Sequence, residues 1–187
     1  MKITGENRIA ASRETVWEAL NDADILRRAI PGCDSLEKLS DTEFKAVVTT
    51  KIGPIKAKFN GDVTLSDLDP PNGYTLSGKG SGGAAGGAKG SARVTLTTDG
   101  ADATRLAYEV DAQVSGKLAQ LGSRLIESTA KALAAKFFTT LQQIVGGEAP
   151  TEPDAKPRKA VTAGLPVWVW GAGAALLIAL VLYGLFG

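Results

Sequence analysis

Residues 118–144, LAQLGSRLIESTAKALAAKFFTTLQQI, are the stretch around which the rest of the chain is arranged. Large apolar residues recur there mainly at steps of four or eight, which predicts a helix with one buried face. Thr129 and several alanines interrupt this face, so it is thin in the middle. A start near residues 115–117 and a stop at Gly146 fit helix-capping chemistry. The expected helix runs from Leu118 to Ile144, and its buried face carries Leu121, Leu125, Leu133, Phe137 and Leu141.

The preceding stretch, from Asp34 to Gly116, alternates apolar and polar residues with a period of two, which predicts β-strands. Turn sequences at residues 53–54 and 99–100 divide this stretch into hairpins. Alternation over several consecutive hairpins is typical of an antiparallel sheet with one buried and one solvated face. We therefore expect such a sheet to lie against the long helix.

The first 33 residues predict a strand followed by two short helices. Residues 1–10 place isolated isoleucines among polar residues, as in a strand. Ser12 and Asp22 are each suited to cap a helix, and the Pro31-Gly32 pair ends the second one. Together with the sheet and the long helix, these elements give an α+β domain over residues 1–146.

The inward positions of the sheet become small near the glycine-rich hairpin, at Gly78, Gly80, Ala88, Gly90 and Ala92. Because protein cores are close-packed, small residues facing small residues imply either a close approach of the helix or a ligand cavity. Both alternatives remain open from the pattern. If a cavity is present, the alternation assigns its lining to Phe44, Val48, Phe59, Val63, Tyr74, Leu76, Gly78, Ala92, Val94, Tyr108, Val110, Leu121, Leu125, Thr129 and Leu133.

Composition excludes several classes of function. The chain has no histidine and a single cysteine, Cys33, so zinc sites, Ser-His pairs and internal disulfides are excluded, and no metal site is predicted. Cys33 is expected to be a small buried side chain and not a reactive thiol. The net charge is only +1, which argues against nucleic acid as a partner. Residues 78–83 match G-x-G-x-x-G, but a hairpin follows them, so we interpret them as a flexible tip and not as a phosphate site.

The composition changes after residue 146. Residues 147–164 are polar and rich in proline, which predicts a linker. Residues 165–186 carry no charge and are long enough to cross a bilayer, so we expect a transmembrane helix. Basic residues precede this segment, and the positive-inside rule then places the N-terminal domain in the cytoplasm. The expected protein is held at the cell (inner) membrane by a single C-terminal anchor.

Three segments carry a resemblance to a known family: AIPGC at residues 29–33, the glycine-rich hairpin from Gly78 to Gly90, and GKLAQLGSRLI at residues 116–126. Over residues 1 to about 146, the chain resembles the CoxG family of carbon monoxide dehydrogenase subunits. That family lies within the helix-grip superfamily, also called START-like or SRPBCC. The resemblance implies a helix-grip fold, in which a curved antiparallel sheet wraps around a long C-terminal helix.

The resemblance also implies a role as a non-catalytic partner of a molybdenum-containing carbon monoxide dehydrogenase or of a related molybdenum hydroxylase. Because helix-grip relatives mostly hold apolar ligands, we expect a non-covalent quinone (menaquinone or ubiquinone) or another isoprenoid or lipid, and no covalent cofactor. One alternative is a ligand-free docking or assembly factor for the dehydrogenase at the lipid bilayer. Another is an enzyme of the cyclase or hydrolase type, although the register puts the candidate acids Glu109 and Asp111 on the solvated face.

Overall fold

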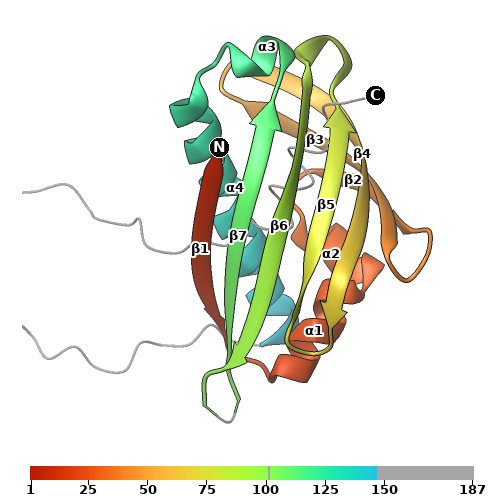
Figure 1. Cartoon of the computed structure of the whole chain (residues 1–187), viewed down its shortest axis with the longest axis vertical. Helices are drawn as coiled ribbons and strands as arrows, with labels where there is room; N and C mark the ends of the chain where they lie inside the picture. Colours follow the sequence, from red (N-terminus) through yellow and green to blue (C-terminus); the bar gives the residue numbers. More distant parts are fainter. Residues whose placement is uncertain (101, 147–187) are drawn as a thin grey trace, which may run out of the picture.

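A seven-stranded antiparallel sheet curves around one long helix in the computed structural model (Figure 1). The structure describes residues 1–100 and 102–146. The strand order is β1-β7-β6-β5-β4-β3-β2, so that β1 and β2 are the edges. The elements are β1 (Lys2–Ile9), α1 (Arg13–Asn21), α2 (Ala23–Ala29), β2 (Cys33–Lys38), β3 (Glu43–Ile52), β4 (Ile55–Asp69), β5 (Gly73–Ser81), the 3₁₀ turn η1 (Gly83–Ala85), β6 (Gly87–Thr98), β7 (Thr104–Val114), α3 (Gly116–Ala119) and α4 (Ser123–Val145).

The sheet register agrees with the predicted alternation. Tyr74 of β5 lies opposite Val94 of β6, which lies opposite Tyr108 of β7, so these three residues form one inward-facing row. Two rows further on, Gly78 lies opposite Gly90 and Gly90 lies opposite Ala112. Of the eleven strand residues predicted to face inward, ten are buried and Gly78 is half-buried. The prediction of an antiparallel sheet with one solvated face is therefore confirmed.

The two short helices begin where their capping residues predict. The Ser12 hydroxyl oxygen accepts a hydrogen bond from the Thr15 backbone N–H at 3.2 Å. The Asp22 carboxylate accepts one from the Ile25 backbone N–H at 2.9 Å. Each cap satisfies a backbone donor that the first helical turn leaves without a partner. Helices α1 and α2 then cover the inner face of the sheet beside the C-terminal half of α4 (Figure 1).

The prediction of one continuous helix from Leu118 to Ile144 is wrong. The chain forms the short helix α3, breaks at residues 120–122, and starts again as α4. The break occurs because Gly122 has a φ of +81°, a left-handed backbone conformation that cannot continue a right-handed helix. The predicted end at Gly146 is confirmed, since this residue is the C-cap of α4.

The predicted buried face of the long helix is correct only in its C-terminal half, where Phe137 and Leu141 are fully buried. A series with steps of four residues advances about 40° beyond a full turn at each step, so it drifts across the helix surface. Leu125 and Leu141 are separated by four such steps and cannot both face the sheet directly. The buried residues of α4 are Ile126, Ala130, Ala134, Phe137, Phe138, Leu141 and Gln142.

The domain has two ends, which we name after the helices that lie there (Figure 1). The α3 end comprises α3, the first turn of α4, the β3–β4 turn and the β5–β6 connection with η1. These segments touch, because a Cβ at Gly53 would lie 2.8 Å from Leu125 Cδ2 and one at Gly86 would lie 2.9 Å from Gly116 Cα. The glycine-rich connection is therefore packed against α3, while its predicted flexibility stays a prediction. The α1 end comprises α1 and the β4–β5 and β6–β7 turns.

The predicted linker at residues 147–164 and the predicted transmembrane helix at residues 165–186 lie outside the described residues. Within residues 1–100 and 102–146, no helix is both long enough and apolar enough to cross a bilayer.

Candidate functional site

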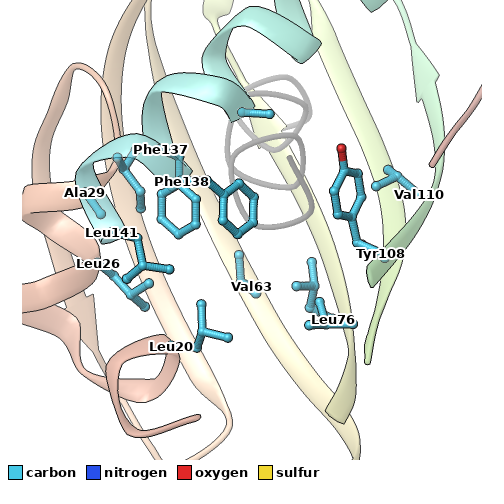
Figure 2. Packing of buried hydrophobic residues seen from close by; sticks show 14 of the residues in the cluster. Leu20, Leu26, Ala29, Val63, Leu76, Tyr108, Val110, Phe137, Phe138 and Leu141 are labelled. Carbon is cyan, nitrogen blue, oxygen red and sulfur yellow. The ribbon is translucent and has the colours of Figure 1, made fainter. Parts of the chain in front are cut away.

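The interior between the sheet and α4 has a bulky half, which we call the aromatic half. It lies toward the α1 end and is built from Phe137, Phe138 and Leu141 of α4 together with Leu20 of α1 and Leu26 of α2 (Figure 2). The Phe137 and Phe138 rings meet edge to face with centroids 4.9 Å apart, and Phe138 stacks on Tyr108 at 6.3 Å. Such aromatic contacts and the burial of large side chains make this half a close-packed core.

The other half, toward the α3 end, is lined by small side chains, and we call it the small-residue half. Its strands carry Gly78, Ala88, Gly90 and Ala112, and α4 faces it with Ala130. The backbone of α4 comes closest to α2, α1, β1 and β3, and not to β5 and β6, which carry three of the four small strand residues. Contact with α4 alone therefore gives these residues little reason to be small, and the ligand cavity stays a prediction.

One of these small residues has a local explanation. A Cβ at Gly90 would lie 2.5 Å from the Asp111 carbonyl oxygen and 3.1 Å from Ala112 Cα, both in the neighbouring strand β7. Glycine is required at this position because the two strands approach each other too closely for a side chain. The remaining small residues carry the argument for a ligand.

Two tyrosines mark the boundary between the halves, in the row that Val94 shares with them. Tyr74 is 3% exposed and Tyr108 is 2% exposed. Neither hydroxyl oxygen has a hydrogen-bond partner among the described residues. The Tyr108 hydroxyl points away from Leu141 and Leu20, toward the end of the interior where α4 begins (Figure 2). A polar atom without a partner therefore faces the small-residue half.

Burial determines the protonation of both phenols. Desolvation raises the pKa of Tyr108 to about 12 and raises the pKa of Tyr74 further above its ordinary value. Both hydroxyls are therefore protonated at neutral pH and can donate a hydrogen bond to an acceptor that enters the interior.

The helix residues assigned to the predicted pocket are only partly buried. Leu121, Thr129 and Leu133 are half-buried, and Leu125 is 38% exposed. The Thr129 hydroxyl donates to the Leu125 carbonyl oxygen at 2.9 Å, so it is satisfied within the helix. The residues of α4 that do face the sheet near these positions are Ile126 and Ala130, which sequence reasoning missed because it followed the large side chains.

A measurable groove lies on the other face of the sheet. It has a volume of about 620 Å³ and crosses the outer face of β4 to β7. Its lining is polar and shares only Gly78 with the predicted pocket: Asp62, Thr64, Ser77, Gly78, Lys79, Lys89, Gly90, Ser91, Asp111 and Gln113. The groove is open to solvent and contains no buried polar group, so the predicted pocket between the sheet and α4 remains the better candidate for an apolar ligand and remains a prediction.

Two other polar side chains near the interior have structural roles, although Gln142 Nε2, like the two tyrosine hydroxyls, has no partner among the described residues. The Thr104 hydroxyl donates to the Ala11 carbonyl oxygen at 2.8 Å, and the Gln142 side-chain oxygen accepts from the Ala10 N–H at 2.8 Å. These two contacts attach the end of β1 to β7 and to α4. No group of three or more potential metal-ligating side chains occurs in the part of the chain that the structure describes.

Cys33 is less buried than the sequence predicts, although its thiol has the low reactivity that we expected. Its side chain is half-buried, and burial raises its pKa to about 11. A thiol with such a pKa is almost entirely protonated at neutral pH and is a poor nucleophile. Glu109 and Asp111 are exposed on the outer face, as expected.

Known proteins share this fold. A conserved protein from Geobacillus kaustophilus superimposes with a TM-score of 0.73 at 32% identity, over 78% of this chain and 95% of its own. A START superfamily protein from Mycobacterium smegmatis gives a TM-score of 0.59 at 15% identity over 77% and 96%. The Zhui aromatase/cyclase from Streptomyces sp. R1128 gives 0.56 at 15% identity over 78% and 93%. At 15% identity, the last two show the fold alone.

A comparison with curated protein sequences gives no match. A family model does match: the one that describes the CoxG subunit of carbon monoxide dehydrogenase aligns with residues 5–146. This match spans nearly the whole described domain, from β1 to the C-cap of α4. The chain therefore belongs to the CoxG family.

Proposed function

We propose that the domain binds a respiratory quinone, or another isoprenoid or lipid, in the small-residue half of its interior and presents it to a carbon monoxide dehydrogenase or a related molybdenum hydroxylase at the membrane. The observation that carries the proposal is the pair of buried hydroxyls, on Tyr74 and Tyr108, for which residues 1–100 and 102–146 supply no hydrogen-bond partner. The small residues beyond Tyr108 and the distance of α4 from β5 and β6 support it.

The chemistry of the tyrosines selects the class of ligand. A buried hydroxyl without a partner costs about 1–3 kcal/mol. A ligand that places a carbonyl oxygen within reach of Tyr108 removes this cost, because the protonated phenol donates to it. Menaquinone and ubiquinone combine such carbonyl oxygens with apolar rings and isoprenoid tails that suit an interior of alanine, glycine and valine.

The rest of the domain supports a binding role over a catalytic one. The buried polar or titratable side chains of the described part are two tyrosines, two threonines and a glutamine, and no carboxylate is among them. Such a set contains no group that is poised near neutral pH for acid–base work. The family description, a subunit of carbon monoxide dehydrogenase, supports that enzyme as the partner.

The uncharged run at residues 165–186 supports the membrane part of the proposal. Quinones partition into the bilayer, so a protein that exchanges them benefits from being held next to it. A soluble dehydrogenase then receives its electron acceptor from the domain and need not enter the lipid phase.

The test is direct detection of the ligand. The full chain is purified in mild detergent and extracted with organic solvent, and the extract is analysed by mass spectrometry for isoprenoids. We expect a co-purifying quinone, and a thermal stabilisation of the emptied protein when quinone is added, which reaches about 2.7 kcal/mol at 100 times the Kd. A protein that is empty and gains no stability from added quinone contradicts the proposal and leaves ligand-free docking as the better function.

A further inference from the structure

We infer that the α3 end of the domain docks onto an anionic lipid surface. The inference deepens the proposed function, because it states which face of the domain meets the bilayer, and it rests on that function for the identity of the ligand that is exchanged there. The docking itself is argued from charge and apolar exposure, which do not depend on the ligand.

The α3 end carries a group of basic side chains that we call the cationic cluster. All of its members are exposed, and none forms an ion pair with another described residue. They come from the β3–β4 hairpin, the β5–β6 hairpin and the α3–α4 junction: Lys51, Lys56, Lys79, Lys89, Lys117 and Arg124. A cluster from three separate segments is a feature of the folded surface, because no single segment contains more than two of its members.

Four of these lysines are paired with each other across strands. Lys51 lies directly opposite Lys56, and Lys79 lies directly opposite Lys89. Like charges at directly opposed positions destabilise an antiparallel pair. Asp62 lies opposite Lys79 on the neighbouring strand and offsets part of the repulsion in the second pair, although the two form no ion pair. The Lys51–Lys56 pair has no acidic residue in its cross-strand register, and two lysine pairs at one end of the sheet favour contact with a negatively charged surface.

The α1 end has the opposite charge. Acidic side chains outnumber arginines in helix α1 and in the β4–β5 and β6–β7 turns. Three arginines lie at this end and are paired with acids: Arg8, Arg13 and Arg105. The acidic residues are Glu14, Glu18, Asp67, Asp69, Asp99 and Asp102. An anionic lipid surface therefore attracts the α3 end and repels the α1 end, which orients the whole domain.

Apolar side chains are exposed within the cationic cluster. Leu125 is one of the three large exposed apolar residues in the described part of the chain, and it lies against the β3–β4 turn, where Pro54 is also exposed. Leu121 and Ile55 beside them are half-buried. Apolar side chains surrounded by lysine and arginine are the composition of surfaces that insert into the headgroup region. A protein partner with an acidic surface would complement the lysines but gives no reason for Leu125 and Pro54 to be exposed among them.

The tether permits this orientation although α4 ends at the α1 end. Helix α4 has 23 residues and is about 35 Å long. The 18 residues between Gly146 and Leu165 can extend to at most about 60 Å. The linker can therefore run along the domain while the α3 end faces the lipid. This orientation places the small-residue half, and not the aromatic half, nearest to the bilayer.

The test uses the full chain with Cys33 replaced by serine and one environment-sensitive fluorophore on an introduced cysteine. Pro54→Cys places the probe at the α3 end, and Thr98→Cys places it at the α1 end, both at exposed positions. In vesicles that contain 30% phosphatidylglycerol, we expect the probe at position 54 to shift to the blue and to be quenched by nitroxide-labelled lipids. The probe at position 98 is expected to change in neither respect.

The charge dependence is tested with Lys51→Glu/Lys56→Glu and with a matched control, Lys131→Glu/Lys136→Glu, on the exposed side of α4. Each lysine near an anionic surface is worth roughly a fivefold change in partitioning. We expect the Lys51→Glu/Lys56→Glu substitutions to abolish the fluorescence shift at position 54. For the unsubstituted lysines, 0.5 M salt or vesicles of pure phosphatidylcholine should abolish it as well. The control variant is expected to retain the shift. Circular dichroism verifies that each variant is folded.

The inference is overturned if position 98 responds in place of position 54, if neither responds, or if the shift persists in neutral lipid or in the Lys51→Glu/Lys56→Glu variant. Quinone retention by the same variant in detergent separates this inference from the proposed function. If the folded variant keeps quinone but does not dock, the lysines serve membrane docking and the proposed ligand is unaffected. If the protein never holds quinone but docks through position 54, the proposed ligand is contradicted and the docking surface is not.

Discussion

The two halves of the interior are built from the same sheet and the same helix. They differ in the size of their side chains and in whether the polar atoms there have hydrogen-bond partners. The aromatic half is filled by Phe137, Phe138 and Leu141, whose exposure does not exceed 6%. The small-residue half presents glycine and alanine, and the Tyr108 hydroxyl that faces it has no partner among the described residues. One half therefore has the properties of a close-packed core, and the other is the half in which we propose a binding site.

If the small-residue half binds a ligand as we propose, this one fold separates stability from function. A close-packed cluster that α1, α2 and the end of α4 share holds the elements together at one end. If this cluster supplies most of the stability, the other end can tolerate small side chains and a hydroxyl without a partner. The predictions below test whether the two halves divide these tasks.

The largest expected effect is the loss of a core aromatic. Phe137→Ala removes a fully buried ring from the aromatic half and is expected to cost about 3–5 kcal/mol of unfolding free energy. Ile126→Ala, the matched truncation of α4 nearer to the α3 end, is expected to cost less, because Ile126 is not a member of the hydrophobic core cluster. Thermal unfolding of the full chain, followed by near-ultraviolet circular dichroism, measures both. Equal losses would contradict the division of the interior.

Alkaline pH is expected to destabilise the protein through the boundary tyrosines. The folded-state pKa of Tyr108, about 12, lies above the value near 10 of an unfolded tyrosine. The contribution of the protonated tyrosine to the free energy of unfolding is therefore complete below pH 10. It is lost as the pH rises from 10 to 12, at roughly 1 kcal/mol per tyrosine and pH unit. Unfolding midpoints at pH 9, 10 and 11 measure the loss. The double variant Tyr74→Phe/Tyr108→Phe is expected to lose less stability over the same range, and an identical loss would contradict the assignment.

Two buried alanines of α4 offer a test of available space. Ala134→Leu is expected to cost about 1–3 kcal/mol, because Ala134 lies one turn from Phe137 and Phe138 in the aromatic half. Ala130→Leu, one turn earlier, is expected to cost less than about 1 kcal/mol, because its added atoms enter the small-residue half. The same substitution is expected to weaken quinone binding at least tenfold. Titration of added quinone, together with thermal unfolding, distinguishes the two variants.

The fold could be predicted from the sequence because the relevant patterns are local. The period of two fixed the inward face of each strand, and the caps at Ser12 and Asp22 fixed the starts of α1 and α2. The break before α4 was missed because a single residue, Gly122, adopts a left-handed conformation inside a pattern that otherwise reads as a helix. The burial of Leu125 was overestimated because steps of four residues drift across the helix surface.

The site was less predictable, for a physical reason. The register brought Tyr74 and Tyr108 to the inward face, as expected, but whether a hydroxyl finds a partner depends on every element around it. The same applies to Gly90, which is small because of its neighbour β7 and not because of a ligand. Sequence patterns assign residues to faces of strands and helices. Whether a polar group has a hydrogen-bond partner, and how closely two backbones approach, are properties of the assembled structure.

The two boundary tyrosines are expected to respond differently to loss of their hydroxyls. At Tyr108 this loss is expected to change protein stability and quinone affinity in opposite directions. Tyr108→Phe removes only the hydroxyl, so the stacking on Phe138 is retained. The empty protein is expected to become more stable by about 1 kcal/mol, because a buried polar group without a partner is deleted. Quinone binding is expected to weaken roughly 2- to 10-fold, because the donor to its carbonyl oxygen is lost.

Tyr74→Phe is the matched control, since Tyr74 lies in the same row but its ring meets Trp17 of α1 at 5.6 Å, on the side of the aromatic half. It is expected to stabilise the empty protein similarly while changing quinone affinity less than Tyr108→Phe does. Opposite signs for stability and affinity at Tyr108 would identify its hydroxyl as a group kept for a ligand at the expense of the fold. A Tyr108→Phe protein that is less stable and binds quinone normally would show instead that the hydroxyl serves the fold, and that the small-residue half needs no ligand.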